Sequence, residues 1–299
     1  MRDAMKRSIC VLFLLLSTTQ AFAWGEKGHL ILGEAAALAL PTSMPHFFLR
    51  RQSELAYLNL EPDRWRGGGE SLDGVNPPDH FLDYEFTAGI ELPRDRYKFI
   101  EAMVQADRFR KQGIRVAEPG FLPWRIAELS ERLTVQFRLW RAASADDRPI
   151  IENAIIQTAG VLGHFAADSS NPHHTTINYN GWILPNPNGY ATDCGTHARF
   201  EREFVARAVD VGMIVAKVGA PRLRDDYFTA AVDGVRTSNA LVESLYTLDR
   251  DGAFSQFGPV SPSGLAFATD RIAVGAGFLR DLWWSAWQNS AKPAKRSRE

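Results

Sequence analysis

The chain is short of cysteine, of long apolar runs and of net charge. Its 299 residues include two cysteines, and 34 Lys and Arg residues face 35 Asp and Glu residues, a formal net charge of −1. Two cysteines cannot supply the disulfide framework that staples small secreted domains. A balanced charge argues against non-specific capture of nucleic acid by a basic surface. With 45% hydrophobic and 23% charged residues, the composition predicts an ordinary globular protein with a packed core.

One apolar run stands near the beginning of the chain. Three basic residues precede an apolar stretch at 9–16, and a small-x-small site ends at Ala23. This order is typical of a secretory signal, and its cleavage would leave Trp24 as the first residue of an exported protein, periplasmic or secreted. Cys10 would leave with the signal, so Cys194 would be the one cysteine of the mature chain. An uncleaved anchor is the alternative, but the run is shorter than the roughly 20 residues of a membrane helix, and no transmembrane segment is expected elsewhere.

The remaining sequence favours helices throughout. Period-two alternation between hairpin turns is nearly absent, whereas apolar residues recur at helical spacing in seven segments: 30–40, 97–109, 124–142, 149–167, 200–209, 227–248 and 268–287. We therefore predict an all-α fold, a single multi-helix domain over residues 24–291, followed by a disordered charged tail at 292–299. The segments 66–78 and 178–195 are rich in Gly, Pro and Asn, and are predicted to be long loops that rim a site.

Two pairs of side chains have the spacing of metal ligands. His164 and Asp168 lie four residues apart in a predicted helix, so both project from one face, as two ligands of one ion must. His197 and Glu201 repeat the spacing. Such pairs are also common as plain contacts on a helix surface. The pattern alone leaves both interpretations open.

The residues around these pairs favour the metal interpretation. An Asn-Pro pair at 171–172 should end the helix and turn the chain back, which brings His173 or His174 toward the same place. Asp63 lies in a predicted loop before His80, and His29 follows Trp24 by five residues. Imidazole and carboxylate ligands without thiolate suit Zn²⁺ in hydrolytic sites.

These residues resemble the zinc-dependent phospholipase C and S1/P1 nuclease superfamily. Members of this family begin with a tryptophan whose amino nitrogen and carbonyl oxygen bind zinc. The similar segments are Trp-Gly-Glu-Lys-Gly-His at 24–29, His-Phe-Leu-Asp at 80–83, His-Phe-Ala-Ala-Asp at 164–168, Asn-Pro-His-His at 171–174 and His-Ala-Arg-Phe-Glu at 197–201. The resemblance selects His174 over His173, and it extends from Trp24 to about Trp287.

The resemblance implies a cleft with three zinc ions. One ion would be held by Asp63, His80, His164 and Asp168, a second by the Trp24 main chain, His29 and Asp168, and a third by His174, His197 and Glu201. Asp63 is preferred as the first ligand over its neighbours Asp73, Asp79 and Asp83.

The activity that the resemblance implies is hydrolysis of a phosphate ester. Asp63 would also orient the attacking water, Arg66 and Arg64 would pair with phosphate oxygens, and Phe81 would contact the substrate. Glu201 as the last ligand resembles the phospholipase branch, whereas Arg66, three residues after Asp63, resembles the nuclease branch.

We therefore expect a phospholipid substrate, with single-stranded nucleic acid as the alternative. A choline head group is not expected, because the acidic and aromatic residues that hold it are not evident after Asp63. The alternative of another class is a protein in which zinc stabilises the fold without catalysis. A protease of the His-Glu-x-x-His type is disfavoured because that motif is absent.

Overall fold

The computed structural model describes residues 24–293. The predicted signal, 1–23, and all but the first two residues of the predicted tail lie outside the described residues. Over the described range the chain forms helices of several kinds and no strand. The all-α, single-domain prediction is confirmed. No helix in this part of the chain is long and apolar enough to cross a bilayer.

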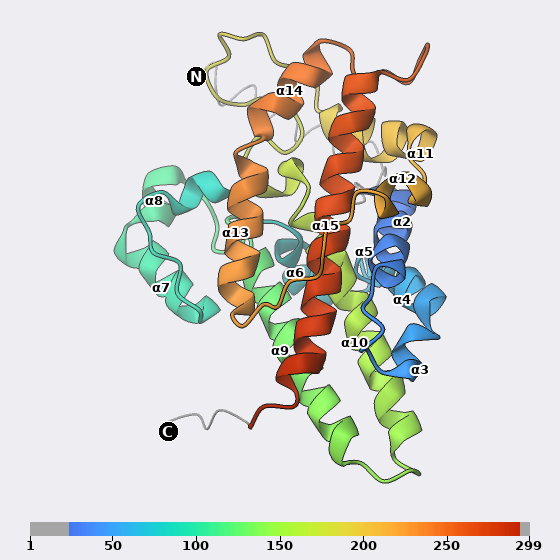
Figure 1. Ribbon diagram of the computed structural model, residues 1–299. Coiled ribbons are helices and arrows are strands. Elements are labelled where there is room, and N and C mark those ends of the chain that lie inside the picture. Colours follow the sequence, from blue (N-terminus) through green and yellow to red (C-terminus); the bar gives the residue numbers. More distant parts are fainter. Residues whose placement is uncertain (1–23, 294–299) are drawn as a thin grey trace.

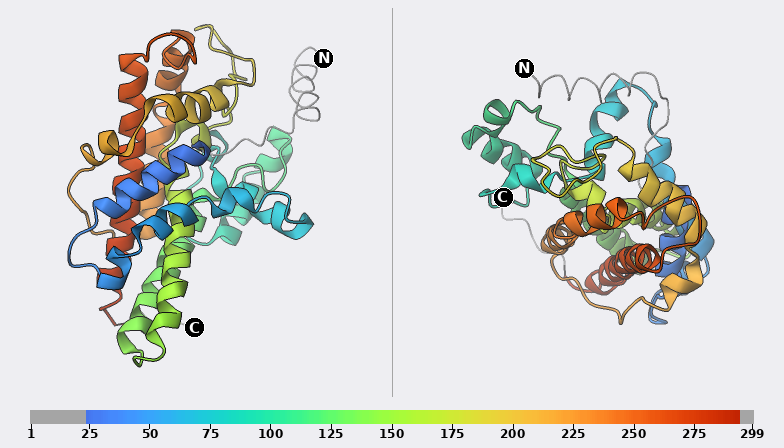
Figure 2. Two further views of the ribbon diagram at one scale, coloured as in Figure 1. Left: turned by 90° about the vertical axis from the view of Figure 1, so that its right-hand side faces the viewer. Right: turned by 90° about the horizontal axis from the view of Figure 1, so that it is seen from above.

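Five helices form the scaffold of the domain: α2 (Gly25–Leu38), α9 (Leu122–Ala142), α10 (Arg148–Asp168), α13 (Tyr227–Asn239) and α15 (Pro262–Asn289). Helices α9 and α10 make a long antiparallel hairpin that reaches the lower end of the molecule in Figure 1. Helix α10 packs against α9, α15 and α2. The views of Figure 2 show these helices gathered around it.

Helix α10 is the centre of the core. It begins with Pro149 in its first turn, where the missing N–H is not needed. Almost every residue from Ile155 to Asp168 is buried, and a helix that is apolar on all sides belongs in the interior. Trp283 of α15 donates its indole N–H to the Ala159 carbonyl at 3.0 Å, which fixes α15 on this helix. The C-terminal end of α10 therefore has a rigid position.

Shorter helices cover the scaffold and carry the connections. The α-helices among them are α3 (His46–Leu49), α4 (Gln52–Leu58), α5 (Glu61–Arg64), α6 (Glu70–Val75), α7 (Arg96–Gln105), α8 (Arg108–Gln112), α11 (Val205–Ala208), α12 (Val211–Val215) and α14 (Val242–Arg250). Three 3₁₀ turns, η1 (Pro77–His80), η2 (Tyr84–Thr87) and η3 (Pro172–Thr175), and the π-helix η4 (Ala198–Phe204) complete the described elements.

Several predicted boundaries were wrong. The helix predicted over 97–109 ends at Gln105, because Asp107 adopts a left-handed conformation with φ of 54°. The helix predicted over 227–248 is divided into α13 and α14. Asp63 lies in the short helix α5, with Pro62 in its first turn, and not in a loop. The predicted loop 66–78 contains α6, which is too short to give a periodic signal.

Candidate metal centre

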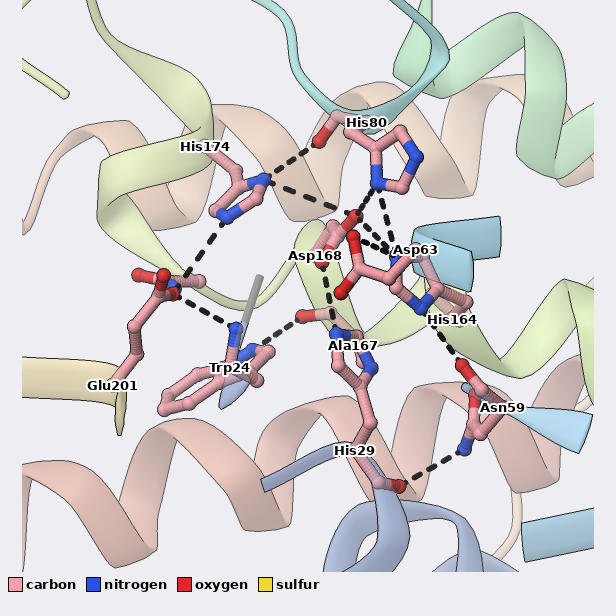
Figure 3. A network of polar contacts seen from close by, with 12 residues as sticks. Trp24, His29, Asn59, Asp63, His80, His164, Ala167, Asp168, His174 and Glu201 are labelled. Atoms are coloured by element: carbon pink, nitrogen blue, oxygen red, sulfur yellow. Dashed lines mark hydrogen bonds and ion pairs between the residues drawn. The ribbon is translucent and has the colours of Figure 1, made fainter. Parts of the chain in front are cut away.

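The nine residues predicted to bind metal lie together at the C-terminal end of α10, and all of them except His197 are labelled in Figure 3. They come from six parts of the chain, and each is at most 7% exposed. The start of α2 supplies Trp24 and His29, α5 supplies Asp63, η1 supplies His80, α10 supplies His164 and Asp168, η3 supplies His174, and the start of η4 supplies His197 and Glu201.

Ligand atoms of these side chains form three groups, each within 4.8 Å: His29, Asp63 and His164; His80, His164 and Asp168; and His174, His197 and Glu201. The last group has the membership that the resemblance implied. The first two differ from the implied sets in grouping His29 with Asp63 and His164. These buried groups could hold metal ions.

Asp168 lies at the centre of the cluster. Its Oδ2 is 3.1 Å from His80 Nδ1, 3.5 Å from His164 Nε2 and 3.8 Å from His174 Nδ1. Its Oδ1 is 3.6 Å from His29 Nε2. Asp168 is also the last residue of α10, where the helix dipole adds partial negative charge. The charge of the Asp168 carboxylate and the dipole of α10 both make this a favourable position for cations.

Two imidazoles are oriented by main-chain carbonyls. His164 donates from Nδ1 to the Asn59 carbonyl at 2.7 Å, and His174 donates from Nδ1 to the His80 carbonyl at 2.8 Å. A donor at Nδ1 leaves Nε2 as the nitrogen with a lone pair, which is the tautomer that a metal ligand needs. His164 Nε2 is 2.9 Å from His80 Nδ1, within the cluster.

Asn59 is a residue of the site that the sequence did not reveal. It is fully buried after α4, and its Nδ2 donates to the His29 carbonyl at 3.2 Å. Two glycines allow this position: a Cβ on Gly33 would lie 2.4 Å from Asn59 Nδ2, and a Cβ on Gly163 would lie 2.4 Å from Asn59 Oδ1. One asparagine thus joins α2 and α10 beneath the cluster. A single polar residue between Leu58 and Leu60 gives no such signal in the sequence.

Glu201 connects the third group to the start of α2. Its Oε1 contacts His197 Nε2, and its Oε2 accepts from the Trp24 main-chain N at 2.8 Å and from Asn171 Nδ2 at 2.7 Å. Trp24 has a left-handed backbone, with φ of 46°, which is rare for a bulky residue. Its indole N–H donates to the Ala167 carbonyl at 2.8 Å. The Trp24 main chain is therefore held at the cluster.

Burial changes the protonation of the cluster. It lowers the pKa of His80 and His164, so both imidazoles are neutral, and it raises the pKa of Asp168. Burial also raises the pKa of Asp63 to about 6, although Arg66 opposes the shift. For His174, burial lowers the pKa, but Asp168 and Glu201 together raise it to about 9. In the metal-free protein, protons on Asp63, Asp168 and His174 therefore balance the negative charge of the carboxylates, which bound cations would otherwise neutralise.

The nitrogen and oxygen atoms of the cluster suit metal ligation better than mutual hydrogen bonding. His80 Nε2, His174 Nε2 and His197 Nδ1 are buried and have no hydrogen-bond partner within residues 24–293. Buried polar atoms in native proteins are nearly always paired. Imidazole nitrogens beside carboxylates, without thiolate, are a donor set of zinc and related divalent ions.

The remaining predicted site residues lie at the edge of the cluster. Arg66 is held by Asp63, with Nε and Nη2 at 3.1 and 3.0 Å from Oδ1. Arg64 is exposed and lies 3.7 Å from Glu26. Phe81 follows His80 and is half-buried.

Two of the three carboxylates that competed with Asp63 in the sequence, Asp73 and Asp79, have other partners. Asp73 accepts from the Gly67 main-chain N at 2.8 Å, and Asp79 pairs with Arg96 at 3.1 Å. Asp63 Oδ1 lies 3.9 Å from His164 Nε2. Of Asp63, Asp73 and Asp79, Asp63 is thus the one that the fold brings to the histidines.

Two histidines stay outside the three groups. His46 is exposed on α3. His173 is buried, with its ring stacked on that of His197 at 4.9 Å between centroids. Of the adjacent pair, His174 is the one whose ring nitrogens face Asp168 and Glu201.

A cleft of about 610 Å³ opens beside the cluster. Its carboxylates are Glu26, Asp63 and Glu201, and its cations are Lys27, Arg64 and Arg202. Its apolar lining includes Leu30, Leu60 and Ala206. The cleft combines charged side chains of both signs, three cations and three carboxylates, with apolar walls next to the candidate metal centre.

Comparisons with known proteins give little further information. No family model and no curated protein sequence matches the chain. Among solved structures, the chain is similar to the alpha toxin from Clostridium absonum, with a TM-score of 0.48 and 14% sequence identity over 91% of this chain and 67% of the toxin chain. The functional assignment therefore depends on the residues of the site.

Proposed function

We propose that this protein is a zinc-dependent hydrolase of phosphate esters, with the cluster around Asp168 as its catalytic centre. The observation that carries the proposal is the sharing of one buried carboxylate among imidazoles from four parts of the chain, at 3.1 to 3.8 Å. An all-protein network would pair these atoms with one another. Here several buried ring nitrogens lack a hydrogen-bond partner in the described part of the chain, as expected of ligands.

The residues that would hold three zinc ions are those that the sequence singled out: Asp63, His80, His164 and Asp168; the Trp24 main chain, His29 and Asp168; and His174, His197 and Glu201. Removal of residues 1–23 would turn the Trp24 nitrogen into a free amine in a protein exported to the periplasm or the medium. That nitrogen already lies 2.8 Å from Glu201. Mass spectrometry of the exported protein would test cleavage after Ala23.

Bound zinc would supply a Lewis acid for the phosphoryl group and an activated water. The chain itself would position the reactants. Asp63 would orient the water, since its carboxylate reaches the cluster and Arg66 holds it in place. Arg66 contacts Asp63 through Nε and Nη2, which leaves Nη1 to pair with a phosphate oxygen. Arg64, in the cleft wall, would add positive charge.

A phospholipid is the substrate that the cleft favours. Leu30 and Leu60 offer apolar contact to a glyceride, while Lys27 and Arg202 attract the phosphate. Single-stranded nucleic acid is the second candidate. Arg66 stands three residues after Asp63, as in the nuclease branch that the sequence resembles, and contacts it at 3.0 Å, and Phe81 would offer a stacking surface.

The experiment is a parallel assay of the metal-loaded mature protein on four substrates. Short-chain phosphatidylglycerol, phosphatidylcholine, single-stranded DNA and RNA are incubated with and without chelator. Asp168→Asn removes the shared ligand, and Asp146→Asn, on an exposed turn, is the matched control. Chelator-sensitive lipid cleavage supports the phospholipase assignment, and cleavage of nucleic acid alone supports the nuclease. Bound zinc without turnover on any of the four substrates identifies a metal-stabilised protein and refutes the proposal.

A further inference from the structure

A second cleft, of about 540 Å³, lies away from the candidate metal centre. Helices α13 and α15 and the segment 217–224 after α12 form its walls, and Ser169 and Ser170 line it directly after α10. None of its lining residues belongs to the three histidine–carboxylate groups. Five cations line it: Lys217, Arg222, Arg224, Arg271 and Arg280.

The carboxylates of this cleft already have partners. Asp281 accepts from Arg224 Nη2 at 3.0 Å and from Arg280 Nη2 at 2.6 Å. Asp270 pairs with Lys217 at 2.6 Å. The third, Asp233, pairs at 2.7 Å with an arginine that does not line the cleft. Five cations and three carboxylates leave the lining with an excess of two positive charges.

Arg222 and Arg271 carry this excess. Neither guanidinium makes a hydrogen bond or an ion pair with any residue of 24–293, and Arg271 Nη1 is buried without a partner. Burial lowers the pKa of Arg271, although the neighbouring Asp270 opposes the shift. The Arg222 main-chain N donates to Asp281 Oδ1 at 2.9 Å, which fixes its backbone in the wall. Arg222 is exposed, whereas Arg271 is half-buried, and a partly buried guanidinium without a partner is unfavourable in a fold that does not use it.

We propose that this cleft is a second ligand site, which binds a small phosphate-bearing anion between Arg222 and Arg271. A phosphate carries nearly two negative charges at neutral pH, which matches the two unpaired guanidiniums. Guanidinium groups bind phosphate oxygens through paired N–H donors. The volume is that of small-molecule sites and fits inorganic phosphate or a phosphorylated small molecule.

The hydroxyl groups of the cleft already donate to main-chain carbonyls, so an anion in the cleft would be recognised by charge. Thr237, Ser238 and Ser170 donate their hydroxyl protons to the carbonyls of Asp233, Ser169 and Ala167 at 2.7 to 2.8 Å. They therefore have no proton left for a phosphate oxygen. The site is independent of the proposed hydrolase activity.

The test is calorimetric titration of the zinc-loaded mature chain with inorganic phosphate and, separately, with glycerol 3-phosphate. Arg222→Gln and Arg271→Gln are each expected to weaken binding about tenfold or more, and the double variant to abolish this site. Arg115→Gln removes the same charge from an 88% exposed side chain elsewhere and should bind as the parent does. Asp168→Asn distinguishes phosphate bound at the candidate metal centre, since the cleft should keep its affinity in that variant.

Unchanged phosphate binding by the double variant would overturn the proposal, whatever the fate of the hydrolase assay. Thermal unfolding gives a second readout. Because Arg271 has no partner to lose, Arg271→Gln should melt at the parent's temperature or above it. A lower melting temperature would make the guanidinium a structural group and would also overturn the proposal. Binding of phosphate but not of glycerol 3-phosphate would support the free ion as the ligand.

Discussion

Replacing Gly163 by alanine should disturb the candidate metal centre by displacing Asn59, which supports it. The added Cβ would lie 2.4 Å from Asn59 Oδ1 and 2.8 Å from its Cγ, closer than real Cβ atoms approach. The Asn59 amide cannot retreat, because Gly33 packs against its other side and Nδ2 is bonded to the His29 carbonyl. The Asn59 main chain must therefore move, and its carbonyl is what orients His164.

The net effect follows from three opposing terms. Alanine is favoured over glycine in a helix by about 1 kcal/mol. Overpacking a tight core costs about 1–3 kcal/mol, and weakening the Asn59 hydrogen bonds costs about 1 kcal/mol more. We expect a net loss of about 1–3 kcal/mol, which lowers the melting temperature by roughly 2–10 °C in a chain of this size. Disturbing a group that orients a ligand should weaken metal binding about 10- to 100-fold.

The assay is thermal unfolding together with zinc titration against a competing chelator. Gly277→Ala in α15 is the matched control, because its Cβ would meet nothing closer than Val218 Cγ1 at 3.8 Å. That variant should be stabilised by about 0.5–1 kcal/mol. If Gly163→Ala were as stable as the control and kept its zinc affinity, the role given to Asn59 would be wrong.

Three further outcomes follow from the site. A mature protein that keeps one extra residue before Trp24 should bind less zinc and lose activity in proportion, because an amide nitrogen replaces the free amine; metal analysis of the two forms checks this. Asn171→Leu removes the amide that donates to Glu201 at 2.7 Å and should weaken zinc binding about 10- to 100-fold, measured by chelator competition. The pKa of His174 is raised from 6.5 to about 9, so its proton stabilises the metal-free fold fully below pH 6.5 and less as pH rises toward 9. Chelated protein should therefore melt at a lower temperature at pH 9 than at pH 6, while zinc affinity, measured by competition, should rise with pH.

The sequence predicted those parts of the site that depend on local geometry. His164 and Asp168 project together because helical spacing requires it, and the Asn-Pro pair at 171–172 turns the chain immediately after α10. Their meeting with His29 and His80 is a long-range contact, which spacing alone does not determine. Those residues were identified from a family resemblance, and their assignment to metal remains a prediction.

The features that the sequence did not reveal depend on contacts between distant elements. Asn59 acts through two glycines, 26 residues before and 104 residues after it. Arg222 and Arg271 are ordinary arginines in the sequence, and their meaning lies in the absence, in the described fold, of a hydrogen-bonded or ion-paired partner for either guanidinium. Helices as short as α5 and α6 are stabilised by their neighbours, so periodicity could not reveal them.

The hydrogen bond from Trp24 to Glu201 spans 177 residues of sequence. During synthesis the N-terminal part of the chain emerges first. The hydrogen bond between Trp24, at the beginning of α2, and Glu201 can therefore form only after Glu201 has been synthesised. The early helices can pair locally before that, but the candidate metal ligands cannot all come together. A protein with this topology would complete its candidate metal centre late, after about two thirds of its chain has been synthesised.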